Sequence, residues 1–277
     1  MNNLLNQKEI IKFKNDGAVL IKEIFNKNWI EKLRNGINKD IKNPSPRFAR
    51  HTKFKNVPGY YEDFWIWDLH DEFKDFLFNS PASQIASELL DANQINLVMD
   101  NWFLRESGAK SSAPFHHDIS YFDFNGTMCV LWLPLEDVNK EDGIAWIKGS
   151  HLWDKLFIRT RFKDGHKDDG EAGIVNGKRY EIIPNILDNK NDYEFLQWDL
   201  KVGDCVFFDI RTVHGTLNET TPKNDVFRYT LRMAKENSKI EYRGDWAKYE
   251  RQIMKSNGYS NGDNLSGKMF PTLYERP

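Results

Sequence analysis

Two histidines and an aspartate stand together in the segment APFHHDISYF, among apolar and aromatic residues that are typical of a buried strand. In a strand alternate side chains face the same side, so His116 and Asp118 would share one face while His117 lies on the other. An imidazole beside a carboxylate supplies two of the three ligands of a two-histidine, one-carboxylate site, which holds non-haem iron(II) and leaves positions open. From these residues alone, a structural ion pair that orients a core histidine explains the pattern equally well.

A third ligand is available in the segment DCVFFDIRTVHGT, which also reads as a strand and carries His214 near its end. If both segments line the interior of a barrel, His214 would complete the site begun by His116 and Asp118. A second His-x-Asp pair, His166 and Asp168, lies in the charged segment FKDGHKDDGEAG, where no alternation sets a common direction for the side chains. We therefore predict that the second pair belongs to a solvated loop.

The elements expected before these segments are mainly helical. Apolar residues at helical spacing predict helices over residues 7–16 and 27–41, the second capped by Asn28, and over 72–91 with an interruption at Pro81. Between the first two helices, GAVLIKEIF is typical of a short strand. The segment PSPRFARHTKFKNVPGYYEDFWIWD has no clear period and is predicted to be a long loop.

Short runs rich in β-branched and aromatic residues follow, each bounded by turn residues. The predicted strands are 95–105, 114–122, 128–135, 144–148, 204–213 and 226–234. Their spacing indicates an antiparallel barrel or a double-sheet jelly roll. We expect one domain over 1–277, with an N-terminal helical part to about 92 and a core of about 93–236, which contains a long insertion of about 152–201, typical of a lid or binding loop. A C-terminal extension of about 237–277 completes the chain.

The composition gives no sign of a nucleic-acid or membrane partner. The chain has 39 Lys and Arg against 41 Asp and Glu, so its charges nearly balance. The first residues lack the features of a secretory signal and no run approaches about 18 apolar residues, which favours a cytoplasmic protein. Cys129 and Cys205 stand in apolar runs and are expected to be reduced core thiols, with a redox role as the alternative. The sequence does not predict the oligomeric state.

Three longer stretches resemble the phytanoyl-CoA hydroxylase family of iron(II)- and 2-oxoglutarate-dependent dioxygenases. They are FHHDISYF, MCVLWLPLEDVNKEDGIAWIKGSH and GDCVFFDIRTVHGTLNETTPKNDVFRYTLRM. The opening EIIKFKNDGAVLIKEIFNKNWIEKLRNGI is similar to the N-terminal helix, strand and helix of that family. The resemblance covers about residues 7–235. It implies a cupin-like double-stranded β-helix, the jelly roll, with flanking helices and an N-terminal helical region.

What the resemblance implies for chemistry is oxidation of an unactivated C–H bond of a small molecule by O2, through hydroxylation, desaturation or cyclisation, with release of succinate and CO2. Carried over by position, it makes His116, Asp118 and His214 the iron(II) ligands. Family members that halogenate have a small residue in place of the metal-binding carboxylate. Because Asp118 is present, halogenation is not expected.

The resemblance also assigns the 2-oxoglutarate site. Arg228 is the expected partner of the far carboxylate, because a guanidinium meets a carboxylate with two parallel hydrogen bonds. Thr216 would assist it, and Trp132 lies either beside the co-substrate or in the core. The family's arginine often follows the distal histidine more closely than here, and Arg232 shares the strand face of Arg228. We favour Arg228 and expect the other arginine to contact substrate or solvent, while His117 is expected to hydrogen-bond behind the ligands.

The substrate cannot be named from the sequence. The candidate pocket residues are Phe122, Asn101, Arg105, Trp146, Arg159, Arg161, Arg50 and Tyr60. If several of them converge, we expect a substrate that is an anionic small molecule with an apolar portion. Two other functions remain open: a non-catalytic sensor that binds 2-oxoglutarate or a metal, and a cupin-type metalloenzyme that does not use 2-oxoglutarate.

Overall fold

The computed structural model describes residues 3–51, 56–110, 113–161, 168–218 and 220–277. The α-helices in this part of the chain are α1 (Gln7–Asp16), α2 (Lys27–Lys42), α3 (Asp71–Asn79), α4 (Ala82–Leu90) and α5 (Lys248–Ser256). The main sheet contains β1 (Ala18–Ile21), β2 (Ala49–Arg50), β3 (Tyr60–Phe64), β4 (Gln94–Arg105), β6 (Met128–Pro134), β12 (Cys205–Asp209), β14 (Val226–Lys235) and β16 (Thr272–Glu275). The smaller sheets contain β5 (Phe124–Asn125), β7 (Ala145–Ile147), β8 (Leu156–Phe157), β9 (Gly173–Val175), β10 (Lys178–Glu181), β11 (Phe195–Leu196), β13 (His214–Gly215) and β15 (Lys239–Ile240).

The main sheet is antiparallel and joins segments that are far apart in the sequence. Its order is β1-β12-β6-β14-β4-β3-β2, and β16 pairs with the first residues of β4. The N-terminal part thus contributes β1, β2 and β3, and the C-terminal extension contributes β16. A small second sheet, β11-β7-β13, carries one of the predicted metal ligands at its edge.

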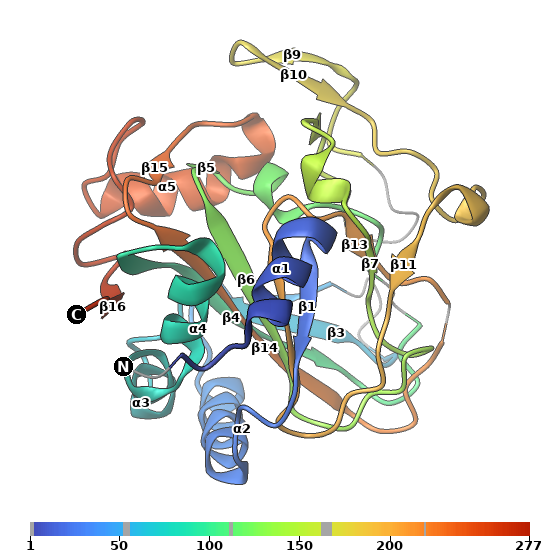
Figure 1. Cartoon of the computed structure of the whole chain (residues 1–277), viewed down its shortest axis with the longest axis vertical. Helices are drawn as coiled ribbons and strands as arrows, with labels where there is room; N and C mark the ends of the chain where they lie inside the picture. Colours follow the sequence, from blue (N-terminus) through green and yellow to red (C-terminus); the bar gives the residue numbers. More distant parts are fainter. Residues whose placement is uncertain (1–2, 52–55, 111–112, 162–167, 219) are drawn as a thin grey trace.

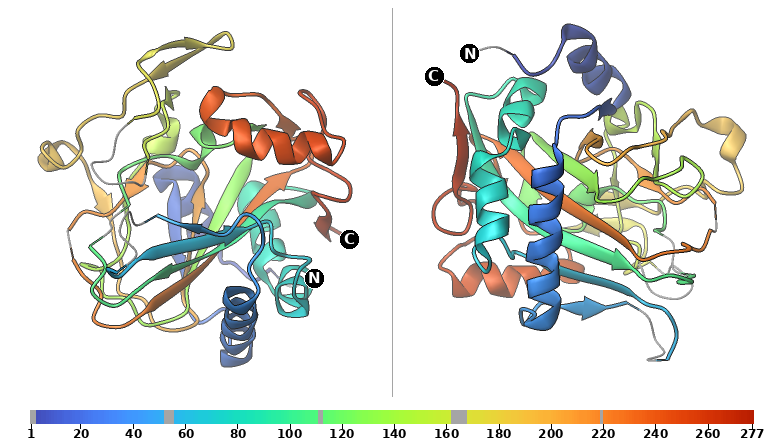
Figure 2. Two further views of the ribbon diagram at one scale, coloured as in Figure 1. Left: turned by 180° about the vertical axis from the view of Figure 1, so that it is seen from behind. Right: turned by 90° about the horizontal axis from the view of Figure 1, so that it is seen from below.

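The central strands are buried on both faces, and their alternation sends side chains into two cores. In β6, Leu131 and Leu133 pack in the core that the helices cover, whereas Val130 and Trp132 pack in the core on the other side. Figure 2 shows α2, α3 and α4 along one side of the sheet and the described part of the insertion of about 152–201 on the other. The predicted ligand His214 lies on that other side, where its ring contacts Phe208.

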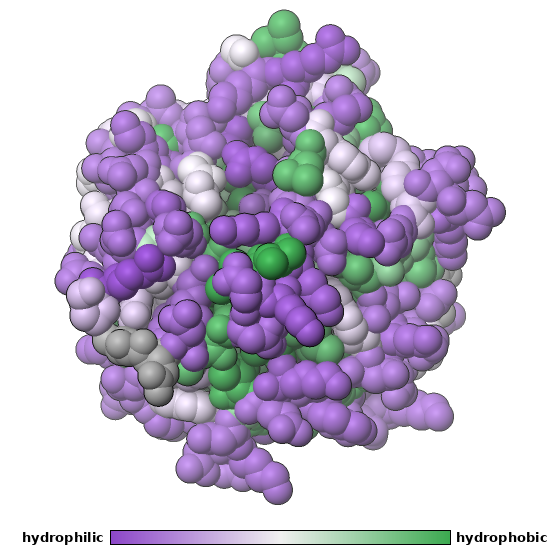
Figure 3. All heavy atoms as spheres, viewed as in Figure 1, coloured by the Kyte–Doolittle hydropathy of each residue, from purple (hydrophilic) through white to green (hydrophobic). Residues whose placement is uncertain are grey.

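The helices present polar surfaces outward, as their periodicity predicts. In Figure 3, most of the visible surface is hydrophilic and the hydrophobic residues occupy small areas. None of the helices in the described residues combines the length and apolar character needed to cross a membrane.

The helix α1 begins with a capping box between Asn6 and Glu9. Gly17 follows its last residue as the C-cap, with a φ of 83° that glycine adopts readily.

Most predicted elements are present, and each exception can be traced to specific hydrogen bonds or strand pairings. The predicted cap Asn28 lies inside α2, because the side chain of Asn26 accepts the hydrogen bond from Trp29 N instead. The predicted loop over residues 44–68 is wrong in part, since it contains β2 and β3, which extend the main sheet beyond β4 (Figure 1). Cys129 and Cys205 are buried free thiols, and burial raises the pKa of both.

The two segments that carry the predicted ligands are not the regular strands expected. In the first, the predicted strand 114–122 is replaced by a single bridge at His116 and a 3-10 turn over Asp118–Ser120. In the second, β12 ends at Asp209, and the chain turns before His214 begins β13. The described residues therefore contain no continuous strand over either predicted range.

Candidate metal centre

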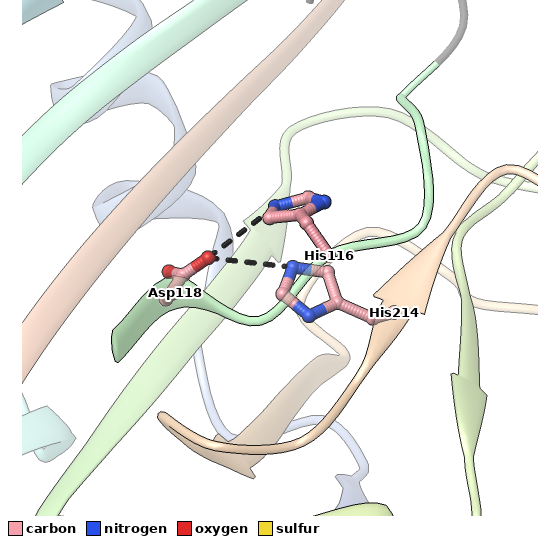
Figure 4. A group of neighbouring side chains, drawn as sticks. All are labelled: His116, Asp118 and His214. Atoms are coloured by element: carbon pink, nitrogen blue, oxygen red, sulfur yellow. Dashed lines mark ion pairs between the residues drawn. The ribbon is translucent and has the colours of Figure 1, made fainter. Parts of the chain in front are cut away.

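The three predicted ligands converge through a backbone bridge between distant segments. The amide of His116 donates to the carbonyl of His214 at 2.9 Å, and the amide of His214 donates to the carbonyl of His116 at 2.8 Å. The 3-10 turn begins at Asp118, and the carboxylate of Asp118 faces the two imidazoles, as Figure 4 shows. A bridge and a turn, not the alternation of one strand, place the ligands together.

The distances fit one bound cation. Asp118 Oδ1 lies 3.4 Å from His116 Nε2 and 3.6 Å from His214 Nε2, and the three ligand atoms lie within 4.8 Å of one another. Two ligands at right angles, each about 2.1 Å from a common ion, are about 3 Å apart. All three residues are buried, so small inward movements of the side chains would close the site around a metal.

Hydrogen bonds behind the histidines direct the correct nitrogen inward. His116 Nδ1 lies 2.7 Å from the carbonyl of Pro114, and His214 Nδ1 lies 2.9 Å from the carbonyl of Thr212. A carbonyl only accepts, so each Nδ1 must carry the proton and each Nε2 is left as a lone-pair donor. Burial, together with the nearby His116, lowers the pKa of His214 to about 3, which keeps its ring neutral and ready to bind metal.

Asp118 is fixed by an arginine. Burial by itself would raise its pKa, but the charge of Arg232 holds the pKa of Asp118 well below its usual range. Arg232 donates from Nε and Nη2 to Asp118 Oδ2 at 2.8 and 2.7 Å, and from Nη1 to Asn101 Oδ1 at 2.8 Å. Oδ2 is thereby occupied and Oδ1 is turned toward the histidines. Arg232 is buried, so it does not reach solvent, but it also lines the cavity, and its expected contact with substrate stays a prediction.

The triad opens into a cavity of about 380 Å³. Arg228 lines it, and the structure records no hydrogen bond or ion pair for this guanidinium with any described residue; its buried Nε is unpartnered. Its carbon Cζ lies 5.3 Å from the ring of Trp132, within cation–π range. Arg105 is close enough to Arg228 that burial and this second charge together lower the pKa of Arg105 to about 10. In this part of the cavity no described carboxylate pairs with the Arg228 guanidinium.

Thr216 and Trp132 both line the same cavity. Thr216 Oγ1 accepts from the amide of Ala113 at 3.0 Å, which leaves the hydroxyl proton available to a ligand. Trp132 packs edge-on against Trp146 with ring centroids 5.7 Å apart, so it is both a cavity wall and part of the core.

Most of the candidate substrate residues lie where the prediction put them. Those that line the cavity are Tyr60, Asn101, Arg105, Phe122, Arg159 and Arg161. Asn101 accepts a hydrogen bond from Arg232, and Arg159 and Arg161 both form ion pairs with Asp169.

Two candidates are misplaced by the prediction. Trp146 is not among the cavity-lining residues; it is buried behind His214, with the two rings stacked at 6.5 Å. Arg50 also lies outside the lining and donates to Tyr61 Oη and to the carbonyl of Val57. The reason is the same for both residues, since their orientation depends on sheet pairings that local sequence does not specify.

His117 lies away from the cavity, as expected. Its Nε2 accepts from the amide of Phe157 at 3.1 Å and lies 2.5 Å from Ser120 Oγ. Burial lowers its pKa to about 3, so it is a neutral structural histidine. Of the second His-x-Asp pair, His166 lies outside the described residues, and Asp168 accepts from Thr160 Oγ1 at 2.8 Å.

Among the cavity residues that the sequence analysis missed, three carry groups that could contact a ligand. Tyr121 stacks edge-on against the ring of His116 at 5.1 Å, and Glu62 and Glu250 contribute carboxylates to the lining. Tyr121 is next to the candidate residue Phe122 and could have been included with it. Glu62 and Glu250 carry no such signal, because one lies in the unexpected β3 and the other in the C-terminal extension.

The comparisons with known proteins point in one direction. A family model described as phytanoyl-CoA dioxygenase matches residues 13–228, while no curated protein matches the chain by sequence. The α-ketoglutarate-dependent carbocyclase SnoK from nogalamycin biosynthesis is 17% identical at a TM-score of 0.74, over 98% of this chain and 97% of SnoK. The epimerase SnoN, solved with Fe3+, α-ketoglutarate and nogalamycin RO, is 17% identical at a TM-score of 0.72, over 97% of this chain and 98% of SnoN. EctD from S. alaskensis, solved with 2-oxoglutarate and 5-hydroxyectoine, is 12% identical at a TM-score of 0.66, over 89% of this chain and 85% of EctD. Similarity at these identities shows a shared fold and confirms the predicted jelly roll.

Proposed function

The chain belongs to the phytanoyl-CoA dioxygenase family, and on this premise we propose that His116, Asp118 and His214 bind its iron(II) and that Arg228 binds its 2-oxoglutarate. The activity class is that of an iron- and 2-oxoglutarate-dependent dioxygenase. The observation that carries the residue assignment is the unpartnered Arg228 in the same cavity as three converging ligand atoms.

When bound, iron(II) and 2-oxoglutarate together activate O2 for oxidation of a C–H bond, with succinate and CO2 as co-products. The protein contributes by positioning the reactants and by excluding water from the site. His116 and His214 present Nε2 because backbone carbonyls hold their Nδ1 protons. Arg232 keeps Asp118 deprotonated and occupies Oδ2, so Oδ1 faces the two histidines and would hold the iron together with their Nε2 atoms.

Arg228 supplies the charge for the far carboxylate of 2-oxoglutarate. A buried, unpaired guanidinium is costly to a fold, and an incoming carboxylate that accepts two parallel hydrogen bonds offsets that cost. Arg105 adds positive potential nearby, and the Thr216 hydroxyl can donate to the same ligand. This arrangement favours a 2-oxoglutarate enzyme over a cupin-type metalloenzyme that does not use the keto acid.

The reaction we propose is hydroxylation, desaturation or cyclisation of a small-molecule substrate. The presence of Asp118 supports this outcome over halogenation, which needs a ligand position that the carboxylate fills. We also propose that the chain forms a single domain, because β1 from the N-terminal part pairs with β12, and β16 from the C-terminal extension pairs with β4.

The test is iron(II)- and O2-dependent conversion of 2-oxoglutarate to succinate across a panel of small molecules. His214→Ala should abolish turnover and weaken Mn(II) binding by about 100-fold or more, since a ligand matters more than the groups behind it. His151→Ala is the matched control, because the Nε2 of His151 contacts the carbonyl of Lys14 outside the cavity. Unchanged Mn(II) affinity in His214→Ala would exclude this triad as the metal site.

A further inference from the structure

A helix beyond the family match reaches into the cavity. The match ends at residue 228, whereas α5 (Lys248–Ser256) comes from the C-terminal extension and contributes Glu250 to the cavity lining. Resting on the proposed function, we propose that Glu250 is a specificity-determining residue that selects substrates carrying a basic nitrogen. This names a substrate class opposite in charge to the anionic one that the sequence suggested.

The extension is firmly attached, so the carboxylate has a fixed place. Arg251 follows Glu250 and donates from Nε and Nη2 to the two oxygens of Asp123 at 2.6 and 3.1 Å, and Asp123 is fully buried. Just before α5, Trp246 Nε1 donates to the carbonyl of Ser120 at 2.7 Å. Ser120 ends the 3-10 turn that begins at Asp118. The helix with Glu250 is therefore fastened to the segment that carries a proposed iron ligand.

One oxygen of the Glu250 carboxylate has no donor. Its Oε2 is buried and accepts no hydrogen bond from any described residue. Burial raises the pKa of Glu250 to about 6, and the charge of Glu62 adds to this, while Arg159 opposes it. A buried carboxylate oxygen without a donor is costly unless a ligand supplies one. An ammonium group of a substrate would do so.

Most other charged groups of the cavity are already committed. The exception is Arg105, which has a buried Nε without a partner but, as a cation, would not bind an ammonium group. Arg159 and Arg161 share the carboxylate of Asp169, and Glu62 lies 2.7 Å from His51. Arg232 is committed to Asp118, and Arg228 is assigned to 2-oxoglutarate. Among the carboxylates of the described cavity residues, Glu250 is thus the one with a buried oxygen that no donor reaches.

The remaining surface suits the apolar body of an amine. Phe64, Tyr121 and Phe122 line the cavity, and aromatic ring faces attract cations. The ring of Tyr121 contacts the ring of His116 and lies 5.9 Å from the guanidinium of Arg159, whose charge acts on Glu250. An amine held by Glu250 would accordingly place its carbon skeleton toward the proposed metal. The cavity of about 380 Å³ must also hold 2-oxoglutarate, which limits the substrate to a small molecule.

The experiment compares three probes of one shape: benzylamine, benzyl alcohol and benzoate. Their binding to the full chain loaded with Mn(II) and 2-oxoglutarate is measured by calorimetry near pH 7.5. We expect benzylamine to bind at least about tenfold more tightly than benzoate, because one charge-assisted hydrogen bond is gained and one repulsion is avoided. Equal binding of benzylamine and benzoate, or tighter binding of benzoate, would overturn the proposal.

Variants assign the preference to the residue. Glu250→Gln should reduce the preference to within about twofold, Glu250→Asp should retain most of it, and Glu250→Lys should reverse it. Glu194→Gln is the matched control, since Glu194 pairs with Lys148 at an exposed position and should keep the wild-type preference. A preference that survives in Glu250→Gln would mean that another group selects the amine.

Two further measurements separate this inference from the proposed function. Glu250→Gln removes an unpaired charge, so it should fold normally and bind Mn(II) and 2-oxoglutarate as the wild type does. If the wild type itself fails to bind Mn(II) and 2-oxoglutarate, the proposed function is wrong. If it binds both but shows no preference for the amine, only the substrate class is wrong.

Discussion

Replacing Arg228 by methionine should separate co-substrate binding from folding. In most proteins, removal of a buried arginine breaks an ion pair and destabilises the fold. Here the structure records no ion pair or hydrogen bond for Arg228 within the described residues, so the replacement breaks neither and removes only the contact with the Trp132 ring. The free energy of unfolding without ligands should remain unchanged or rise, because burial already disfavours this charge and lowers the pKa of Arg228.

The loss should appear in the affinity for 2-oxoglutarate. Truncating one partner of a buried, hydrogen-bonded ion pair costs about 2–5 kcal/mol. Arg105 stays in the cavity beside the vacated position and retains part of the attraction for the carboxylate. We therefore expect the lower part of the range, about 2–3 kcal/mol, which is about a 30- to 150-fold increase in Kd.

The assay is calorimetric titration of 2-oxoglutarate into Mn(II)-loaded protein, together with denaturant unfolding of the apoprotein. Arg228→Lys, which keeps the charge without the planar fork, should fall between wild type and Arg228→Met. Mn(II) affinity should be the same in all three proteins, because Arg228 does not contact the proposed ligands. A Kd for 2-oxoglutarate within about threefold of wild type in Arg228→Met would refute the assignment, and a large loss of apoprotein stability would show that this arginine has a structural partner.

Three other predictions use different parts of the site. Arg232→Met should lower the free energy of unfolding of the apoprotein by about 3–5 kcal/mol, because it leaves Asp118 buried without its ion-pair partner. Mn(II) should stabilise this variant more than it stabilises wild type. Equal stabilisation of the two proteins by Mn(II) in denaturant unfolding would contradict this. The preference for benzylamine should fall as the pH is lowered through about 6, because Glu250 is charged above its raised pKa and neutral below it. If calorimetry gives the same preference at pH 5 and at pH 7.5, Glu250 is not its source. Arg251→Met should destabilise the fold by about 3–5 kcal/mol and weaken the amine preference, since it removes the ion pair that holds α5 to the buried Asp123. Urea unfolding and the same calorimetry check both effects, and an intact preference would show that other contacts are enough to hold α5 in place.

The sequence by itself determined the type of most elements. Helical and strand periodicities depend on neighbours along the chain, so α1 to α4 and the long strands β4, β6 and β14 follow from local patterns. The ligand types were also readable, because histidine and aspartate in apolar surroundings are costly unless something binds them. Resemblance to a family then supplied the pairing of His116 and Asp118 with His214.

Only the tertiary structure decided how these side chains meet. The segment at 116–120 is a bridge and a turn, although its composition is that of a strand, because its partner is a two-residue strand about a hundred positions away. Arg228 and Arg232 share one strand face and have identical chemistry, yet one is bound to Asp118 and the other is unpartnered. Glu250 reaches the cavity through the attachment of α5 to Asp123, a contact between residues 128 positions apart. Such contacts depend on register and on the packing of whole elements, and no local pattern in the chain encodes them.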